Sequence, residues 1–290
     1  MTRLFLFLLW CFHWLPLPVQ AALGWLLAQL LYLFVVPRRR VVHTNLRLCF
    51  PELGERERRR LARRIVVAVT RSMLERGILW WASEARIRRL VELRGVEKIR
   101  ALHAEGRAVV ILVPHFVGLD MAGSRMAMEM DCVSMYSAQN NKLLEEMLLH
   151  GRLRFGHQEL LSRQDGIRGA VKAMKRGRPF YYLPDLDFGP KESVFVPFFG
   201  VQTATVPGLP RIARLANAVV VPLIVRMKPC GRGYLAEFGE PWADFPGEDA
   251  TADTARMNAY IEEEVRKSPE QYYWVHKRFK TRPPGEAKIY

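Results

Sequence analysis

His115 and Asp120 are the residues whose types and spacing best suit acid–base chemistry. They are five positions apart, between an apolar run at 108–113 and a helical pattern that begins just after Gly118. An imidazole is the side chain best matched to take a proton from a hydroxyl group at neutral pH. A carboxylate on its other ring nitrogen fixes the tautomer and stabilises the imidazolium. We therefore predict that a turn at Gly118 folds Asp120 back toward His115, and that Asp120 orients this base.

The sequence also restricts the reaction that such a base would assist. It contains no G-x-S-x-G segment, so a serine nucleophile of that type is not indicated. The hydroxyl group of an acceptor, activated by His115, would then attack a carbonyl group directly, without a covalent enzyme intermediate. A histidine and an aspartate at this spacing are also compatible with a structural histidine. The strand–turn–helix context strengthens the catalytic alternative.

Two further pairs of charged residues are candidate substrate ligands. Arg152 and Arg154 lie at the end of a predicted helix, where they either neutralise anionic substrate groups or form a solvated helix face. Asp185 and Asp187 follow a predicted strand. They either approach a substrate or a cation, or accept hydrogen bonds from their own loop, which we favour. We predict no metal site, because the four cysteines are scattered and form no C-x-x-C pair.

Short apolar runs alternate with helical patterns along residues 107–290, which we expect to form the catalytic domain. Strands are predicted at 108–113, 133–136, 180–183, 194–198, 219–225 and 234–238, and helices at 119–130, 142–154, 167–175, 209–216 and 253–266. This alternation is typical of an α/β domain with a parallel or mixed sheet flanked by helices. His115 is then expected at the carboxyl end of a strand, where open α/β sheets bind their ligands.

Residues 1–36 are predicted to form a membrane anchor. The stretch 4–36 contains no Asp, Glu, Lys or Arg, and Pro16 and Pro18 interrupt it. A signal peptide cleaved after Ala21 is the alternative, although the chain stays apolar for fifteen further residues. An arginine cluster follows, and the positive-inside rule then places the rest of the chain in the cytoplasm. Two geometries remain open: a full crossing of the bilayer, and a bend at the prolines with re-entry.

Residues 37–106 are predicted to form a basic amphipathic helical segment. The window 37–107 holds 19 Lys and Arg against 8 Asp and Glu, a net charge of +11 out of +15 for the whole chain. A basic block directly after an apolar stretch is typical of binding to anionic membrane lipids. Nucleic acids also attract basic surfaces, but the chain has no zinc-ligand spacing and no RNA-binding aromatic motif. We predict anionic membrane lipids as partners, and no nucleic acid.

Several segments resemble those of one known family. Besides the H-x-x-x-x-D pattern, they are 45–52 (NLRLCFPE), 184–191 (PDLDFGPK), 194–200 (VFVPFFG) and 269–283 (PEQYYWVHKRFKTRP). In these segments the chain resembles the lipid A biosynthesis acyltransferases, the lauroyl/myristoyl transferase family within the lysophospholipid acyltransferase superfamily. The resemblance implies a glycerolipid acyltransferase-like fold.

The resemblance also implies substrates and a location. The donor would be an acyl chain on acyl carrier protein, and the acceptor a hydroxyl group of a lipid A precursor; no cofactor is implied. The catalytic domain would lie on the cytoplasmic side of the inner membrane. Ser137 stands where many relatives have arginine, which leaves the exact acceptor open. Two alternatives remain: acyl transfer to another membrane glycolipid or a lysophospholipid, and a non-catalytic protein that binds the membrane surface.

Overall fold

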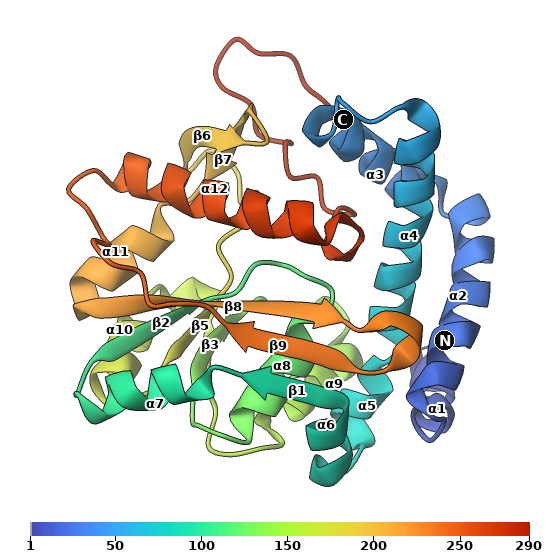
Figure 1. The fold of residues 1–290 in the computed structure, drawn as a ribbon, viewed down its shortest axis with the longest axis horizontal. Helices are drawn as coiled ribbons and strands as arrows, with labels where there is room; N and C mark the ends of the chain where they lie inside the picture. The colour runs from blue at the N-terminus through green and yellow to red at the C-terminus, as the bar shows by residue number, and fades with distance from the viewer. Residues whose placement is uncertain (1) are drawn as a thin grey trace.

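A seven-stranded sheet lies at the centre of the computed structural model, which describes residues 2–290 (Figure 1). Its strands, in sheet order, are β1 (Val91–Arg94), β9 (Tyr234–Phe238), β8 (Ala218–Met227), β2 (Ala108–Leu112), β5 (Phe180–Tyr182), β3 (Val133–Tyr136) and β4 (Glu159–Ser162). Only the β8–β9 pair is antiparallel. The sheet is therefore mixed, which confirms the predicted fold class. A separate hairpin joins β6 (Val194–Phe198) to β7 (Val201–Thr205).

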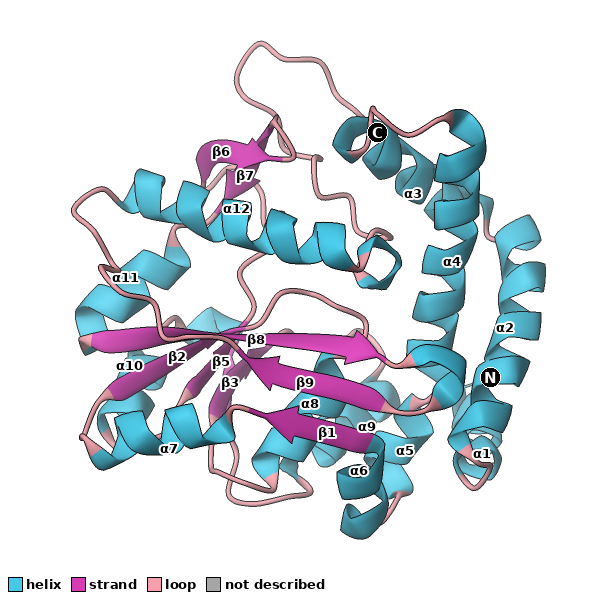
Figure 2. Cartoon of the chain, in the orientation of Figure 1, coloured by secondary structure: helices cyan, strands magenta, loops and turns pink. Residues whose placement is uncertain are grey.

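Helices cover both faces of the sheet (Figure 2). One face carries α10 (Arg168–Lys175), α11 (Gly208–Ala216) and α12 (Ala250–Lys267). The other carries α5 (Arg76–Trp81), α6 (Glu84–Leu90), α7 (Val96–Ala104), α8 (Leu119–Ala127) and α9 (Lys142–Leu153). Three short 3₁₀ turns complete the fold: η1 (Arg163–Asp165), η2 (Pro229–Gly231) and η3 (Pro269–Gln271).

The central strands are buried on both faces, which explains their nearly continuous apolar sequence. In β2, Val110 and Leu112 face the core under α10–α12, whereas Val109 and Ile111 face the core under α5–α9. Alternation of this kind follows from the two-residue period of a strand. The sheet thus holds two apolar cores apart and fixes the loops at its carboxyl edge.

Three strands were not predicted, and one of them corrects the description of residues 37–106. That segment was expected to be helical, but it contains β1, which pairs with β9 at one edge of the central sheet. The other two unpredicted strands are β4, at the opposite edge, and β7 in the hairpin. The sheet therefore begins before residue 107, although the proposed division of the chain into three parts stays a prediction.

An N-terminal layer of helices stands beside the sheet (Figure 1). It consists of α1 (Thr2–His13), α2 (Leu17–Phe34), α3 (Val36–Cys49) and α4 (Glu55–Leu74). The helix α2 packs along α4, and α1 packs on α5. Gly24 permits the close approach, because a Cβ atom there would lie 2.9 Å from Cγ of Arg71. The apolar N-terminal segment therefore lies against the domain along one side.

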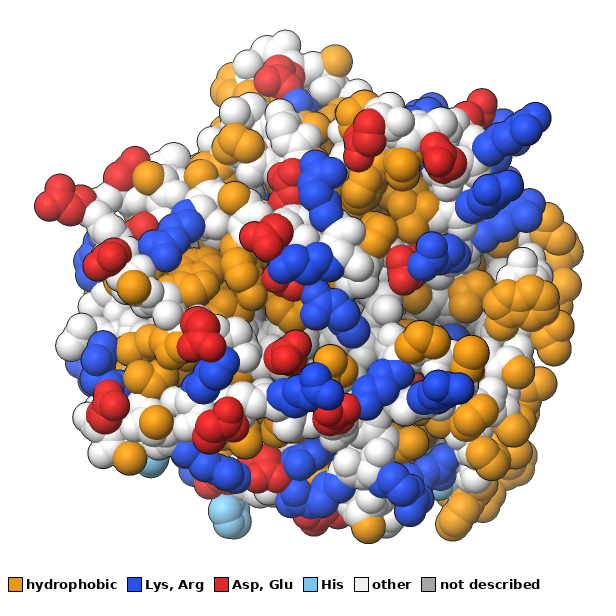
Figure 3. Space-filling model, in the orientation of Figure 1, with side chains coloured by type: hydrophobic (Ala, Val, Ile, Leu, Met, Phe, Trp, Pro, Cys, Tyr) orange, Lys and Arg blue, Asp and Glu red, His pale blue; other side chains and the backbone are white. Residues whose placement is uncertain are grey.

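The opposite side of α1 and α2 is apolar and exposed. Figure 3 shows hydrophobic side chains gathered along this edge, with Lys and Arg side chains close by. Within residues 2–290, α2 is the helix that is long and apolar enough to cross a membrane, judged by length and composition. The side chains that are more than half exposed here are those of Leu4, Phe7, Leu8, Trp14, Trp25, Leu26, Leu30, Leu33 and Phe34.

Candidate active site

His115 lies on the turn between β2 and α8, at the carboxyl end of a strand, as predicted. The turn passes close under β8: a Cβ atom at Gly118 would lie 2.8 Å from Cγ1 of Val225, so glycine is required by the close approach. The His115 side chain is 16% exposed. The imidazole is thus held at the edge of the sheet with limited access to solvent.

Asp185 is the carboxylate that binds the imidazole. It follows β5, the parallel neighbour of β2, so the carboxyl ends of both strands meet at one edge of the sheet. One Asp185 oxygen lies 2.6 Å from Nδ1 of His115, and the other accepts a hydrogen bond from the His115 backbone N–H at 2.9 Å. The Tyr272 hydroxyl donates to the same second oxygen at 2.9 Å. Asp185 is 1% exposed, so these bonds hold it in one position.

This arrangement fixes the proton on the imidazole. Burial by itself would raise the pKa of Asp185, but His115 and the bonds from His115 and Tyr272 lower it below its ordinary value. Asp185 is therefore an anionic acceptor, and the proton of a neutral imidazole resides on Nδ1. The Nε2 atom has no hydrogen-bond partner among the side chains that the structure describes, and it keeps a free lone pair on the side away from Asp185. Such a histidine can act as a general base.

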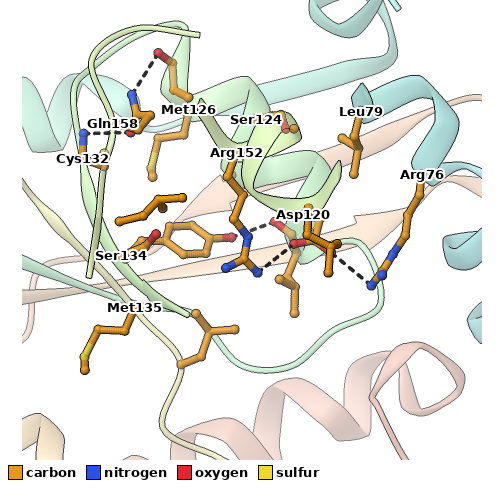
Figure 4. A pocket seen from close by; sticks show the side chains of 18 of the residues that line it. Arg76, Leu79, Asp120, Ser124, Met126, Cys132, Ser134, Met135, Arg152 and Gln158 are labelled. Carbon is orange, nitrogen blue, oxygen red and sulfur yellow. Dashed lines mark hydrogen bonds and ion pairs between the residues drawn. The ribbon is translucent and has the colours of Figure 1, made fainter. Parts of the chain in front are cut away.

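The expected hydrogen bond between Asp120 and His115 is not present, and this part of the prediction is wrong. Asp120 lies in the first turn of α8, between two guanidinium groups (Figure 4). Its carboxylate is 3.3 Å from Arg76 and 3.6 Å from Arg152. Burial would raise the pKa of Asp120, but these two arginines lower it below its ordinary value. A catalytic role for Asp120 stays a prediction, with Asp185 rather than Asp120 orienting the base.

His115 lines a cleft of about 610 Å³, within the size range of small-molecule sites. Arg152, Arg163 and Lys191 bring positive charge to the cleft, and Glu145 and Glu192 bring negative charge. Much of the remaining wall is apolar or aromatic, including Met135, Leu148, Leu186 and Phe188. The cleft can therefore receive a molecule that has both anionic and apolar parts.

A smaller cavity of about 70 Å³ adjoins the cleft. The two share Met135, Leu148, Arg152, Tyr181 and Leu183 in their walls. The smaller cavity is lined mainly by apolar side chains, and Asp120 lies in its wall with Arg76 and Arg152 (Figure 4). An apolar recess thus lies next to the charged part of the cleft.

The two predicted arginines have different surroundings. Arg152 lines the cleft and pairs with Asp120, a placement compatible with its predicted role in substrate binding. Arg154 does not line the cleft; its guanidinium donates to the backbone carbonyl groups of Leu79 and Ala82 at the end of α5. The pKa of Arg154 is lowered by burial. Arg154 therefore links the end of α9 to the end of α5 through hydrogen bonds.

Asp187 also serves the structure of its own loop. It is 4% exposed and accepts hydrogen bonds from the backbone and the hydroxyl group of Thr281, at 2.7 and 2.8 Å, and from the Gly189 backbone N–H. His276 accepts from the Asp187 backbone N–H at 3.0 Å, and burial lowers the pKa of His276 to about 4. The bond from Gly189 is of the favoured kind, hydrogen bonding within the loop, and the two bonds from Thr281 join this loop to the C-terminal segment.

Some residues of the site were missed from the sequence. Tyr272 and the orienting role of Asp185 depend on contacts between distant segments, and nothing in their local sequence indicates them. Arg163 and Lys191 reach the cleft from loops after β4 and β5. In the part of the chain that the structure describes, no group of three or more His, Cys, Asp or Glu side chains is placed to hold a metal ion.

Replacement of Arg154 by glutamine is expected to reduce stability rather than chemistry. The change removes charged donors from two carbonyl groups, a loss of about 1.5–3 kcal/mol in the free energy of unfolding. Thermal denaturation of the purified variant measures this effect. Arg152→Gln is the matched control, expected to change substrate affinity with a smaller shift in Tm. Equal Tm values for the Arg154 variant and the unmodified protein would contradict a stabilising role for Arg154.

Comparison with known proteins places this fold and site in a class of enzymes. The chain matches the family model described as bacterial lipid A biosynthesis acyltransferase over residues 1–281. Because the match spans nearly the whole chain, the class is that of acyltransferases. The chain belongs to the bacterial lipid A biosynthesis acyltransferase family, as the sequence resemblance predicted.

Individual relatives agree with the family match. The lipid A biosynthesis lauroyltransferase of Escherichia coli (strain K12) is 38% identical over 291 residues, which cover 100% of this chain and 94% of that protein. The palmitoleoyltransferase of the same strain is 31% identical, over 97% of this chain and 92% of its own length. Its myristoyltransferase is 33% identical, over 87% of this chain and 78% of its own length. The names of these relatives differ in the acyl group.

Proposed function

We propose that this protein transfers a fatty acyl chain from an acyl carrier protein thioester to a hydroxyl group of a lipid A precursor, with His115 as the general base. The observation that carries the proposal is the bond between Asp185 and Nδ1 of His115, because it leaves Nε2 able to take a proton. The family membership supports the reaction class. The names of the relatives support lipid A biosynthesis as the context.

The proposed reaction needs no covalent enzyme intermediate. Nε2 of His115 takes the proton of the acceptor hydroxyl group as its oxygen attacks the thioester carbonyl carbon. The tetrahedral intermediate then collapses, the carbon–sulfur bond breaks, and the imidazolium returns its proton to the leaving thiolate. Asp185 stabilises the imidazolium between these two steps, as the carboxylate does in hydrolase triads.

Asp120 has a different proposed role, through the arginines beside it. By pairing with Arg76 and Arg152, it holds two guanidinium groups in the wall of the smaller cavity, and Arg152 also lines the cleft. Guanidinium groups bind phosphate and other anions through directed, charge-assisted hydrogen bonds. Arg152 therefore lies where it can contact an anionic group of the substrate, while Asp120 keeps it in place.

The chemistry of the cleft supports an amphipathic substrate pair. Its cations suit a phosphorylated acceptor, and the adjoining apolar recess suits the first part of an acyl chain. The same features are compatible with another phosphorylated membrane glycolipid or a lysophospholipid as acceptor. To decide between these acceptors, purified full-length protein is incubated with acyl carrier protein donors of several chain lengths and with each acceptor. Mass spectrometry of the products then shows which acceptor is acylated. Absence of acylated lipid A precursor, with another acceptor consumed, would contradict the proposed substrate.

The exposed apolar side of α1 and α2 supports attachment to a membrane, and we propose the cytoplasmic face of the inner membrane as its location. Trp25, Leu26 and Leu30 lie on this side, and each is more than half exposed. The packing of α1 on α5 favours retention of the N-terminal segment over removal after Ala21, since cleavage there would uncover that contact. We propose that the basic residues that follow α2 contact anionic headgroups, as basic segments beside apolar ones do.

Two charges on the exposed side of α2 are expected to release the protein from the membrane. Each leucine is about half exposed, so its burial in the membrane contributes about 0.8–1.5 kcal/mol, and Leu26→Glu/Leu30→Glu should lower the vesicle partition coefficient at least about tenfold. Leu153→Glu/Leu215→Glu is the matched control, since these leucines are 48% and 58% exposed on helices away from α2. Vesicle sedimentation measures both variants. Equal partition of the two double variants would show that α2 is not the attachment surface.

A further inference from the structure

A basic groove lies beside the apolar edge, apart from the cleft that holds His115. It has a volume of about 410 Å³ and lies between α2, α4, the end of β8 and η3. Its charged wall residues are four cations and one acid: Arg63, Arg64, Arg71, Lys228 and Glu270. None of its wall residues belongs to the wall of the His115 cleft. We call it the α2–α4 groove.

The charges of the groove are only partly compensated within its own walls. Arg64 pairs with Glu270 at 3.0 Å, and its side chain is 65% exposed. The Arg63 guanidinium lies over the Tyr32 ring, 5.4 Å from the centroid, and Lys228 pairs with Glu92, which lies outside the groove. The formal charge of the wall residues is therefore +3, and the ion pairs of Lys228 with Glu92 and of Arg71 with Glu75 reduce the net charge to +1. A groove with a net positive charge favours an anion.

Arg71 supplies a second, independent observation. Its Nε donates to Glu75 at 2.9 Å, and its side chain is 11% exposed. The Nη2 atom is buried and has no hydrogen-bond partner in the described part of the protein. A buried guanidinium donor without a partner is costly. An anionic oxygen that enters the groove can satisfy this donor after a small movement of the side chain.

The neighbours of the groove indicate where the anion comes from. Trp25 and Gln29 form the α2 side of the wall, and Trp25 is 52% exposed. Leu26 and Leu30, which directly follow Trp25 and Gln29 in the same helix, are exposed. Tryptophan beside lysine and arginine is typical of the headgroup level of a membrane. An anion here therefore lies directly beside a surface suited to acyl chains.

We propose that the α2–α4 groove binds the phosphate group of an anionic membrane lipid, whose acyl chains lie along the apolar side of α2. The phosphate oxygens contact Arg63, Arg64 and Lys228 and reach toward Arg71. This site is separate from the catalytic cleft, so one bound phospholipid fixes the orientation of the domain on the membrane without occupying the acceptor site.

The experiment measures lipid binding to the full-length protein in an uncharged detergent by native mass spectrometry. Phosphatidylglycerol is expected to bind with a stoichiometry of one, and far more tightly than diacylglycerol, which has no phosphate. Arg63→Gln/Arg64→Gln/Lys228→Gln should weaken binding at least about tenfold, since each cation near a membrane contributes on the order of 1 kcal/mol. Lys172→Gln/Lys175→Gln/Arg211→Gln removes three exposed charges from α10 and α11 and is expected to stay within twofold.

A second measurement locates the lipid. Phosphatidylglycerol with brominated chains should quench tryptophan fluorescence, and Trp25→Phe should remove the saturable part of this quenching. Thermal denaturation confirms that the triple variants are folded; if the groove variant is not, Arg63→Gln and Lys228→Gln are measured singly, with a few-fold weakening expected for each.

Three outcomes would overturn the proposal. Equal weakening in both triple variants would mean that binding depends on total charge rather than on the groove. Binding of diacylglycerol as tight as that of phosphatidylglycerol would leave only the apolar contact with α2. Inorganic phosphate that displaces phosphatidylglycerol at a similar concentration would make the groove a site for the free anion. None of these measurements depends on turnover, so they are separate from any test of the acyltransferase reaction.

Discussion

His115→Ala is expected to lower the rate of acyl transfer by about 10²–10⁴, the usual contribution of a general base. The bond from Nδ1 to Asp185 fixes the orientation of the imidazole at the carboxyl end of β2. Its other ring nitrogen, Nε2, has no hydrogen-bond partner among the described side chains. Its removal leaves the acceptor hydroxyl group protonated during attack on the thioester. Single-turnover acyl transfer under saturating donor measures the chemical step directly.

The control for this variant tests whether the protein is still folded. His115 donates one side-chain hydrogen bond, and the backbone bonds of the turn to Asp185 and Tyr273 remain in the alanine variant. Membrane binding and the far-ultraviolet circular dichroism spectrum should therefore be unchanged. A folded His115→Ala protein that retains activity within a few-fold of the unmodified enzyme would refute the assignment of the base.

Asp185→Asn is expected to lower the rate by a comparable factor, about 10²–10⁴, through the tautomer of His115. An asparagine amide can present an N–H to Nδ1, which favours the tautomer with its proton on Nε2. That tautomer cannot accept the proton of the acceptor. Asparagine is similar in size, and its oxygen can still accept from Tyr272 or from the His115 backbone, so the fold should persist. The Tm of the variant checks this point.

Double variants separate the roles of the two acidic residues. If Asp185 acts through His115, then His115→Ala/Asp185→Asn should be scarcely slower than His115→Ala alone, because residues that act as one unit are strongly non-additive. If Asp120 acts through Arg76 and Arg152, its loss should multiply with that of His115. Multiplicative losses for Asp185 would contradict the pairing seen in the structure. Non-additive losses for Asp120 would restore it as a partner of the base.

Much of the fold follows from local sequence patterns. The buried strands β2 and β8 are continuous apolar runs, and their bounds were predicted to within about two residues. The strands that were missed are short and carry polar residues: β1 contains Glu92 and Arg94, and β7 contains Gln202. Edge and hairpin strands are exposed on one side, so polar side chains there stay in contact with water. The apolar pattern that predicts a buried strand is therefore weak in their sequences.

The site was harder to predict than the fold, because the order of the strands in the sheet brings His115 and Asp185 together. The sequence shows His115 after one strand and Asp185 after another, but not that β2 and β5 are parallel neighbours. Asp120 is closer to His115 in sequence, and the five-residue spacing favours it. The start of α8 holds it among arginines instead. The sequence therefore predicted the position of His115 at the carboxyl end of a strand, and its role as the base stays a prediction. The order of the strands in the sheet decides which carboxylate contacts it.

The C-terminal segment that closes the site has a consequence for the timing of synthesis. Tyr272 and Tyr273 supply bonds to Asp185 and His115, and the Asn45 side chain holds the same segment through the carbonyl groups of Trp274 and His276. These residues leave the ribosome more than 200 residues after α2. At about 5–20 residues per second, that delay is on the order of 10–50 seconds. The helices proposed to meet the membrane are therefore available for insertion well before His115, the proposed base, acquires its final contacts. On the proposed function, each molecule would then become active only after it has had time to reach the membrane.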